Sequence, residues 1–428
     1  MSALAVYLVV FIGLIALAMP IGFALGLSTL LVFWMTDQPV QLFAQRLWTG
    51  LDRFTLVAIP LFILAGELMG GSGILQRLLD FARLLVGRFK GSLLQINIVV
   101  SMFFGGINGS AIADTSAVGS MMIKATKEEY GDGELVAAVT AVSSVVGPVI
   151  PPSLPMLIYA FAAGNVSIAA LFLAGIVPGV LLGLSMMVVT AILVRRKDYP
   201  ASDRRYSMTE ALRICGRFLI AAILPVIMVG GVVGGFATPT EAGCIAIVYA
   251  LLIGFLVTRQ LTWALVHAAM VRTIIVTAVV MILISVGNVS TWWLTIEGVP
   301  RWISTTLQET TSSPMVFLAL MLVIYLVIGL FIEQAAAMVM LVPIFAPLAA
   351  AYGIDPVHFG LFTCLALALG LVTPPVGLCL FIAGGIANVP IHRVFVAAGP
   401  YLVAMFLILL LVTFVPQIYL WLPQMMGF

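Results

Sequence analysis

Long apolar stretches separated by short polar intervals account for nearly the whole chain. A membrane-spanning helix needs about 20 apolar residues, so this pattern predicts a polytopic α-helical membrane protein. The stretch 3–35 is uncharged and longer than the apolar core of a signal peptide, and we expect it to be a retained first helix. The other uninterrupted spans are predicted at residues 55–71, 168–194, 218–234, 239–258, 262–288 and 394–422.

One short motif interrupts two further apolar stretches. Residues 147–153 read GPVIPPS and residues 370–377 read GLVTPPVG, so a Gly-x-Val-x-Pro-Pro core recurs at an offset of 223 residues (370 minus 147). Paired prolines stop a helix, because proline has no N–H and pushes the residue before it out of helical geometry. We therefore predict broken helices over residues 135–165 and 357–388, which in a membrane must be buried in protein or line a wet cavity. Two unrelated proline kinks are the alternative.

Small and polar residues disturb the apolar stretch that precedes each broken helix. Residues 103–120 read FFGGINGSAIADTSAVGS, and the stretch 315–348 has Gly329 and Glu333 near its centre. A helical hairpin that enters the membrane part-way needs permissive backbone at its turn, so we predict one hairpin in each stretch. The order hairpin, polar gap, broken helix and span thus occurs twice, and known transporter architecture suggests repeats in opposite membrane orientations.

Three polar stretches lie between these elements. Residues 74–90 alternate leucines with basic residues, which predicts an amphipathic helix along the membrane interface, although a solvated helix would have the same pattern. Residues 195–217 hold seven of the 19 Lys and Arg residues, and short basic loops stay cytoplasmic. A patch for nucleic acid or anionic lipid is the alternative there. Residues 289–313 are polar and rich in tryptophan, as expected for an interfacial connection or arm.

Composition narrows the class of function. The chain is 63% hydrophobic and 8% charged, against roughly 25% charged residues in soluble domains. It has no GxxxxGK[ST], HExxH or GxSxG motif, and its three histidines are far apart in sequence, so neither an ATPase nor a membrane enzyme is supported. The four cysteines show no CxxC pairing, which suggests neither a disulfide framework nor a zinc site. We expect no enzyme activity and no cofactor.

Four carboxylates lie in largely apolar sequence: Glu67, Asp114, Glu241 and Glu333. A carboxylate near the bilayer centre costs about 2.5–3.5 kcal/mol on insertion scales, so it usually faces a partner or a cavity. We expect structural ion pairs for Glu67 and Glu241. Asp114 and Glu333 each stand in a disturbed segment ahead of a broken helix, and for these two we expect a role at the site.

The broken helices themselves offer ligands. Freed carbonyl groups at Gly147, Ile150, Gly370 and Thr373 can coordinate a hard cation such as Na⁺. The half-helix that follows each Pro-Pro pair presents free N–H groups and a positive dipole end, which suit a carboxylate. The pattern predicts an anionic substrate with cation coupling, and it leaves proton coupling open.

Several motifs occur along nearly the whole chain in an order typical of one transporter family. They are LFILAGELM at 61–69, NGSAIADTSAVGS at 108–120, VGPVIPPS at 146–153, LFLAGIVPG at 171–179, GGFATPTEA at 234–242, GIDPVHFG at 353–360 and TPPVG at 373–377. With these motifs the chain resembles the large membrane subunit (DctM type) of the tripartite ATP-independent periplasmic, or TRAP, transporters. One departure is MMIKA at 121–125, where the family often has a Pro-containing LIPAM-like run, and it affects only the local helix end.

The resemblance implies an inverted-repeat elevator transporter. Residues 91–194 and 314–428 would form the moving transport domain, each with one hairpin and one broken helix. Residues 1–90, with the interfacial amphipathic helix, and 218–313, with the arm, would form the scaffold, and 195–217 a cytoplasmic loop. The resemblance also implies Na⁺ coupling, a small four-helix membrane subunit, a soluble periplasmic substrate-binding protein, and a place in the bacterial or archaeal cytoplasmic membrane. The family moves organic acids such as C4-dicarboxylates, sugar acids and sialic acids, among which this sequence does not choose.

Site residues follow from the same resemblance, position by position. Glu333 stands where the family often has an acid near the substrate, and Asp114 and Ser153 are the other expected substrate contacts. One sodium site would involve Asn108, Ser110, Gly147, Ile150 and Pro152, and a second would involve Gly329, Gly370, Thr373 and Val376.

The sequence therefore predicts the large subunit of a Na⁺-coupled, binding-protein-dependent importer of organic anions, with no nucleic-acid partner. A stand-alone secondary carrier or exporter, without a binding protein, is the main alternative. An anion channel or a membrane enzyme is a more distant one. Neighbouring genes for a secreted binding protein and a small four-helix membrane protein would favour the first hypothesis.

Overall fold

The computed structural model describes residues 3–164, 166–195, 197, 199 and 206–428, and these residues form helices and turns without a β-strand. Seven helices in this part of the chain are long and apolar enough to cross a membrane, and several shorter apolar helices accompany them. The predicted all-α polytopic membrane fold is confirmed.

The first apolar stretch is a pair of helices rather than one. α1 (Ala3–Ala16) and α2 (Ile21–Met35) pack against each other. The chain turns between them at Ala18, whose φ is 60°, and Pro20 directly precedes α2. The prediction of a single helix over 3–35 was wrong, because Pro20 cannot donate the hydrogen bond that a continuous helix needs.

The next helices include one that the sequence did not predict, α3 (Val40–Leu51). A short 3₁₀ helix, η1 (Phe54–Val57), then leads into α4 (Ala58–Gly71), which confirms the span at 55–71. α5 (Ile74–Val86) is the predicted amphipathic helix: its leucines at 75, 78 and 79 are buried, whereas Arg83 is exposed.

The basic interval 195–217 is partly helical. α10 (Ile168–Arg195) runs up to it, and α11 (Met208–Pro225) begins inside it, where Ser207 and Glu210 form a capping box. The prediction for residues 196, 198 and 200–205 lies outside the described residues. α11 continues through a π-helical turn, η2 (Val226–Gly230), into α12 (Gly231–Val233).

Thr238, rather than Thr240, caps α13 (Pro239–Leu252), which a π-helical turn, η3 (Ile253–Thr258), extends. The Glu241 carboxylate accepts the Thr238 N–H at 2.8 Å. Within the described residues Glu241 has no ion pair, so the expected pair was wrong: the carboxylate closes a capping box instead.

The longest helix is α14 (Trp263–Ile296), with 34 residues. It includes Trp292 and the buried Trp293, so the expected connection over 289–313 begins later than predicted. No Gly or Pro stands between Asn288 and Glu297 to stop the helix, and Gly298, in the left-handed region with φ 71°, then ends it. Only α15 (Val299–Thr310) remains as the arm.

The two predicted hairpins and two predicted broken helices are confirmed, in equivalent order. α6 (Ser92–Asn108) and α7 (Ala111–Tyr130) form the first hairpin, and α8 (Gly133–Ser144) and α9 (Leu154–Ala163) the first broken helix. The second set is α16 (Pro314–Gly329), α17 (Gln334–Ala351), α18 (Pro356–Gly370) and α19 (Leu378–Ala387), followed by α20 (Ile391–Phe414) and α21 (Gln417–Met425).

Packing between the repeats is reciprocal. α8 lies along α19 and α9 contacts α18, so the two broken helices run side by side in opposite directions. α7 of the first hairpin packs on α19, and α17 of the second packs on α9. Each hairpin is therefore held against the broken helix of the other repeat, as expected for inverted repeats.

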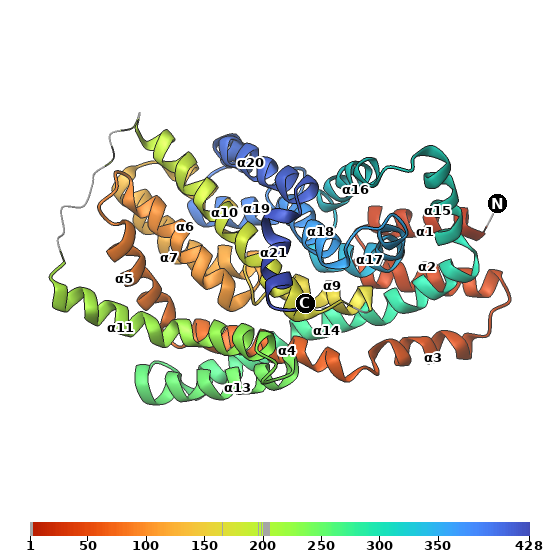
Figure 1. Cartoon of the computed structure of the whole chain (residues 1–428), viewed down its shortest axis with the longest axis horizontal. Coiled ribbons are helices and arrows are strands. Elements are labelled where there is room, and N and C mark those ends of the chain that lie inside the picture. Colours follow the sequence, from red (N-terminus) through yellow and green to blue (C-terminus); the bar gives the residue numbers. More distant parts are fainter. Residues whose placement is uncertain (1–2, 165, 196, 198, 200–205) are drawn as a thin grey trace.

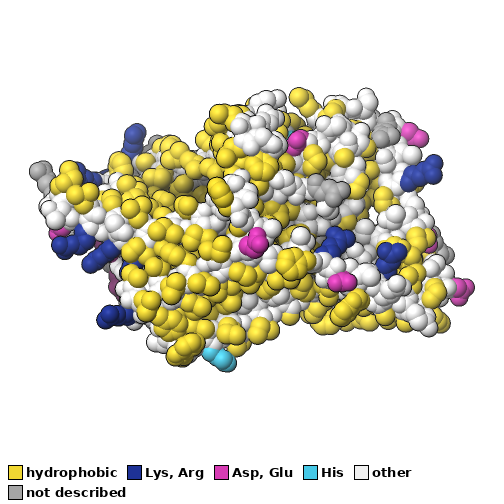
Figure 2. All heavy atoms as spheres, turned by 60° about the horizontal axis from the view of Figure 1, so that its bottom comes forward, with side chains coloured by type: hydrophobic (Ala, Val, Ile, Leu, Met, Phe, Trp, Pro, Cys, Tyr) yellow, Lys and Arg dark blue, Asp and Glu magenta, His cyan; other side chains and the backbone are white. Residues whose placement is uncertain are grey.

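Five of the other helices lie to one side of these repeats. In Figure 1, α11, α13, α4, α14 and α3 form a row along one edge, and the hairpins and broken helices lie together above it. Figure 2 turns this row forward and shows a broad apolar surface, with Lys and Arg gathered mainly at its left end. The exposed side chains on this row include Leu219, Ile245, Val248, Ile274 and Ile275. A surface of this kind suits lipid or another membrane helix.

Asp132, directly before α8, binds two residues that follow α10, Lys197 and Tyr199. Its carboxylate accepts hydrogen bonds from the ammonium group of Lys197, from the Tyr199 hydroxyl at 2.7 Å and from the Leu135 N–H at 3.0 Å. Burial alone would raise the pKa of the Asp132 carboxyl, but the bonds from Lys197 and Tyr199 outweigh it and hold that pKa below its ordinary value. The carboxylate therefore stays charged at neutral pH.

Candidate functional site

The turn of the first hairpin lies directly against the first broken helix. α6 ends at Asn108, Gly109 adopts a φ of 65°, and Ser110 caps α7 by accepting the Ala113 N–H at 3.4 Å. A methyl group at Gly109 would lie 2.8 Å from the Leu154 nitrogen. The glycine is required for its backbone conformation and for this close approach.

A second contact one turn earlier joins the same two segments. A methyl group at Gly105 would lie 2.5 Å from the Gly147 Cα, and one at Gly106 would lie 3.0 Å from the Ile150 side chain. The segment between α8 and α9 contains a cis bond between Pro151 and Pro152. The predicted cluster of Asn108 and Ser110 with residues 147–152 is thus brought together by the fold.

The first break exposes the acceptors that the sequence predicted. In the part of the chain that the structure describes, no group donates a hydrogen bond to the carbonyl of Gly147 or Ile150, and the Asn108 amide makes none. Ser153 is not free: its hydroxyl donates to the Pro148 carbonyl at 2.6 Å and accepts the Met156 N–H at 3.3 Å, which caps α9. Break 1 (residues 145–153) therefore offers oxygen ligands beside a capped helix N-terminus.

The second break is built in the same way, with one difference. A methyl group at Gly370 would lie 2.1 Å from the Gly329 carbonyl oxygen, so the end of α16 touches the end of α18. We had expected a free carbonyl at Gly370, but this carbonyl accepts the Thr373 N–H at 3.2 Å. The Thr373 carbonyl accepts no hydrogen bond among the described residues, as predicted. The Thr373 hydroxyl donates to the Leu369 carbonyl at 2.8 Å, and Val376 is 40% exposed.

All four irregular segments meet at one small cavity of about 40 Å³. Ser110 from the first hairpin turn and Glu333 from the second face it, and Pro148 and Leu371 come from the two breaks. The start of α9 supplies Leu154, Pro155 and Ile158. A cavity of roughly 150 Å³ holds one benzene molecule, so this space suits an ion or a few water molecules and is too small for an organic acid.

Glu333 is the N-cap of α17. Its carboxylate accepts the N–H groups of Ala335 at 2.9 Å and Ala336 at 3.2 Å. Sequence reasoning missed the neighbouring Gln334, which also lines the cavity and donates to the Cys364 carbonyl at 2.8 Å. Its only signal in the sequence is an uncharged polar residue beside Glu333 in an apolar stretch.

The fold does not bring Asp114 to this cavity. Asp114 lies in the first turn of α7, fully buried, and neither carboxylate oxygen has a hydrogen-bond partner within the described residues. Glu67 also lies apart from the site: it accepts a hydrogen bond from the Arg272 guanidinium at 2.7 Å, which confirms the expected ion pair and links α4 to α14.

Comparison with known proteins places this architecture. The family model of the tripartite ATP-independent periplasmic transporter, DctM component, matches residues 8–418. The sialic acid TRAP transporter large permease protein SiaM of Vibrio cholerae is 36% identical over 418 residues, which cover 97% of each chain. The C4-dicarboxylate large permease DctM of Pseudomonas aeruginosa is 35% identical and covers 94% of each chain, and the 2,3-diketo-L-gulonate large permease YiaN of Escherichia coli is 33% identical.

The solved structures agree on the fold. The YdaH transporter of Alcanivorax borkumensis superposes with a TM-score of 0.65 over 88% of each chain, at 16% sequence identity. The curated relatives are bacterial, and the protein is a multi-pass transporter permease of the inner membrane, a class without catalytic activity. The chain belongs to the DctM family, the large membrane components of the tripartite ATP-independent periplasmic transporters.

Proposed function

We propose that this chain is the transport subunit of a Na⁺-coupled, binding-protein-dependent importer of organic acid anions. The observation that carries the proposal is the convergence of both hairpin turns and both breaks on one cavity. Broken helices that meet inside a membrane protein are the usual place where transporters bind substrate and coupling ions.

Sodium suits the ligands at the two breaks. The carbonyls of Gly147, Ile150 and Thr373 accept no hydrogen bond among the described residues, and the first break packs against the hairpin turn that carries Asn108 and Ser110. Oxygen atoms, including those of carbonyl and hydroxyl groups, are the ligands that a hard cation prefers. Pro152, Gly329, Gly370 and Val376 would contribute by shaping these loops.

The substrate class follows from charge and from relatives. Leu154 and Pro155 at the start of α9 line the cavity, and the positive dipole end of a helix favours a carboxylate. The relatives named for sialic acid, C4-dicarboxylate and 2,3-diketo-L-gulonate transport all concern organic acids. Because the cavity of about 40 Å³ holds none of them, the hairpins must move to admit substrate, in keeping with an elevator motion of residues 91–194 and 314–428.

The partners are proposed from the family name, which describes a tripartite, periplasmic system. A small four-helix membrane subunit would cover part of the apolar row in Figure 2, and a periplasmic binding protein would deliver the acid. The basic interval 195–217 would face the cytoplasm.

Uptake into proteoliposomes tests the proposal. The purified chain is reconstituted alone, with the small subunit, and with both partners, and accumulation of succinate, N-acetylneuraminate and a sugar acid is measured with an inward sodium or potassium gradient. We expect accumulation only with both partners and sodium. Strong sodium-driven accumulation by the chain alone would instead establish the stand-alone carrier, and accumulation that ignores sodium would refute the coupling.

A further inference from the structure

A second and larger cavity, of about 220 Å³, lies beside the first. α3, the segment before η1 and α14 form one wall, and α9 and α17 form the other. A cavity of roughly 150 Å³ holds a benzene molecule, and this cavity exceeds that volume whereas the central one does not. It is large enough for a small organic molecule.

The two cavities follow each other along the same pair of helices. Ile158 of α9 and Ala335 of α17 line the central cavity, whereas Ala162 and Val339 line the larger one. On each helix the step is four residues, which is about one turn, or roughly 6 Å. A molecule in the larger cavity is therefore one helical turn from the place where both hairpins and both breaks meet.

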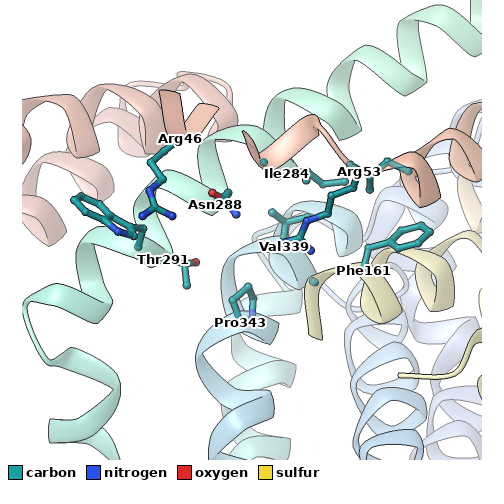
Figure 3. A pocket seen from close by; sticks show the side chains of 13 residues that line it. Arg46, Arg53, Phe161, Ile284, Asn288, Thr291, Val339 and Pro343 are labelled. Carbon is teal, nitrogen blue, oxygen red and sulfur yellow. The ribbon is translucent and has the colours of Figure 1, made fainter. Parts of the chain in front are cut away.

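Two arginines give the larger cavity its charge. Figure 3 shows the side chains of Arg46 and Arg53 extending from opposite sides into the space between α14 and α17, with Asn288 between them. Arg46 is held in place by stacking, its Cζ atom 5.0 Å from the centre of the Trp292 ring. Neither arginine forms an ion pair anywhere in the described part of the chain.

Among the residues that the structure describes, no acidic side chain lines this cavity. Asn288 and Thr291 are its other polar side chains, and its remaining lining is apolar, including Phe161 and Val339. Guanidinium groups remain charged at any physiological pH and bind carboxylates through paired N–H donors. The cavity therefore combines two guanidinium groups that have no ion-pair partner, two neutral polar side chains and an apolar wall. This combination suits the carboxylate and the carbon skeleton of a small organic acid.

We propose that Arg46 and Arg53 form a receiving site for the carboxylate of the transported acid, one turn of α9 and α17 before the central cavity. This inference rests on the proposed function and adds a place where the anion is held before the hairpins admit it. The arginines lie on α3 and the segment that follows it, outside both repeats. The site would therefore hold the acid between the scaffold and the transport domain, which is proposed to move against the scaffold.

Uptake kinetics give the first test, with the full three-component system in proteoliposomes and with succinate and N-acetylneuraminate as probes. Arg46→Gln and Arg53→Gln should each raise the half-saturating acid concentration about ten-fold, since each removes a charge-assisted contact. The half-saturating sodium concentration should stay unchanged, which shows that the folded sites are intact. Arg301→Gln is the matched control, because Arg301 is an exposed arginine of α15 that does not line the cavity. Arg46→Lys and Arg53→Lys, which keep the positive charge, should each raise the half-saturating acid concentration less than the corresponding Gln variant.

A chemical test needs no transport. Phenylglyoxal modifies accessible guanidinium groups, and mass spectrometry reports the extent at each arginine. Succinate or N-acetylneuraminate should protect Arg46 and Arg53 but not Arg301, and succinamide and the methyl ester of N-acetylneuraminate should protect none.

The outcomes separate the two proposals. Robust sodium-driven uptake with unchanged acid affinity in the double variant Arg46→Gln, Arg53→Gln overturns the receiving site and leaves the proposed function standing, as does equal modification with and without acid. Wild-type protein that accumulates neither acid, and that neither acid protects, refutes the proposed substrate class and the receiving site together.

Discussion

Gly370→Ala tests whether contact between the end of the second hairpin's first helix and the second break controls sodium binding. The added Cβ would lie 2.1 Å from the Gly329 oxygen, 2.3 Å from its carbonyl carbon and 2.7 Å from its Cα. All three atoms are backbone, so no side chain can rotate away. The two segments must separate by about 0.9 Å (3.0 minus 2.1) before the contact becomes tolerable.

The strain from this contact can appear in one of two measurable quantities, the sodium dependence of uptake or the stability of the protein. Overpacking of this kind costs about 1–3 kcal/mol, which corresponds to about 5- to 150-fold in an equilibrium constant. If the hairpin moves away from the break, the cost falls on sodium, and the half-saturating sodium concentration for uptake rises by that factor. If the repeat loosens as a whole, the midpoint of thermal unfolding in detergent falls instead.

Gly385→Ala is the matched control. Gly385 lies in α19, and a methyl group there would meet nothing within 4 Å. Alanine is the better helix former by about 1 kcal/mol, so this variant should be as stable as the wild type or more so, with normal sodium dependence. Wild-type sodium dependence and an unchanged unfolding midpoint in Gly370→Ala would refute the reasoning.

Three further predictions use the same two assays. Thr373→Val and Ser110→Ala should each raise the sodium requirement with near-normal expression, and an unchanged requirement in both, singly and combined, would leave sodium ligation to the backbone alone. Glu67→Gln should lower stability by about 1 kcal/mol or less, because the Arg272 side chain that pairs with it is 56% exposed, and the effect should vanish when Arg272 is already replaced by Gln. Asp132→Asn should lower the unfolding midpoint. The pKa of Asp132 is held below its ordinary value, so the stability that this carboxylate contributes is fully present above its pKa in the unfolded chain and is lost only as the pH falls through its pKa in the folded protein. The difference in unfolding midpoint between wild type and variant should therefore stay constant from about pH 8 to about pH 5. A midpoint difference that shrinks within that interval would contradict the assignment.

The repeats were predictable from sequence because their signals are local. The Pro-Pro pairs and Gly109 act on the backbone at their own positions, so their effect can be predicted without knowing what packs against them. The same is true of the leucine and arginine pattern of α5. For this reason the hairpins, the broken helices and the amphipathic helix could be predicted correctly.

What could not be predicted depends on contacts between distant segments. Gln334 is one polar residue in an apolar stretch until the fold places it against the cavity. Arg46 and Arg53 stand in sequence far from both repeats, and only the packing of α3 against α14 turns them toward α9 and α17. Asp114 shows the reverse: it stands four residues from Ser110, yet the helix carries it into the protein interior and away from the cavity.

The reciprocal packing of the repeats has a thermodynamic consequence. α7 rests on α19 and α17 rests on α9, so each hairpin is braced by the helix that follows the other repeat's break. If an ion orders one break, it would also order the support of the opposite hairpin, and the second ion would then bind more tightly. By linkage, each site would raise the affinity of the other by the same factor. Two sodium sites held in this way would fill cooperatively, and uptake would rise with sodium concentration more steeply than a single-site curve.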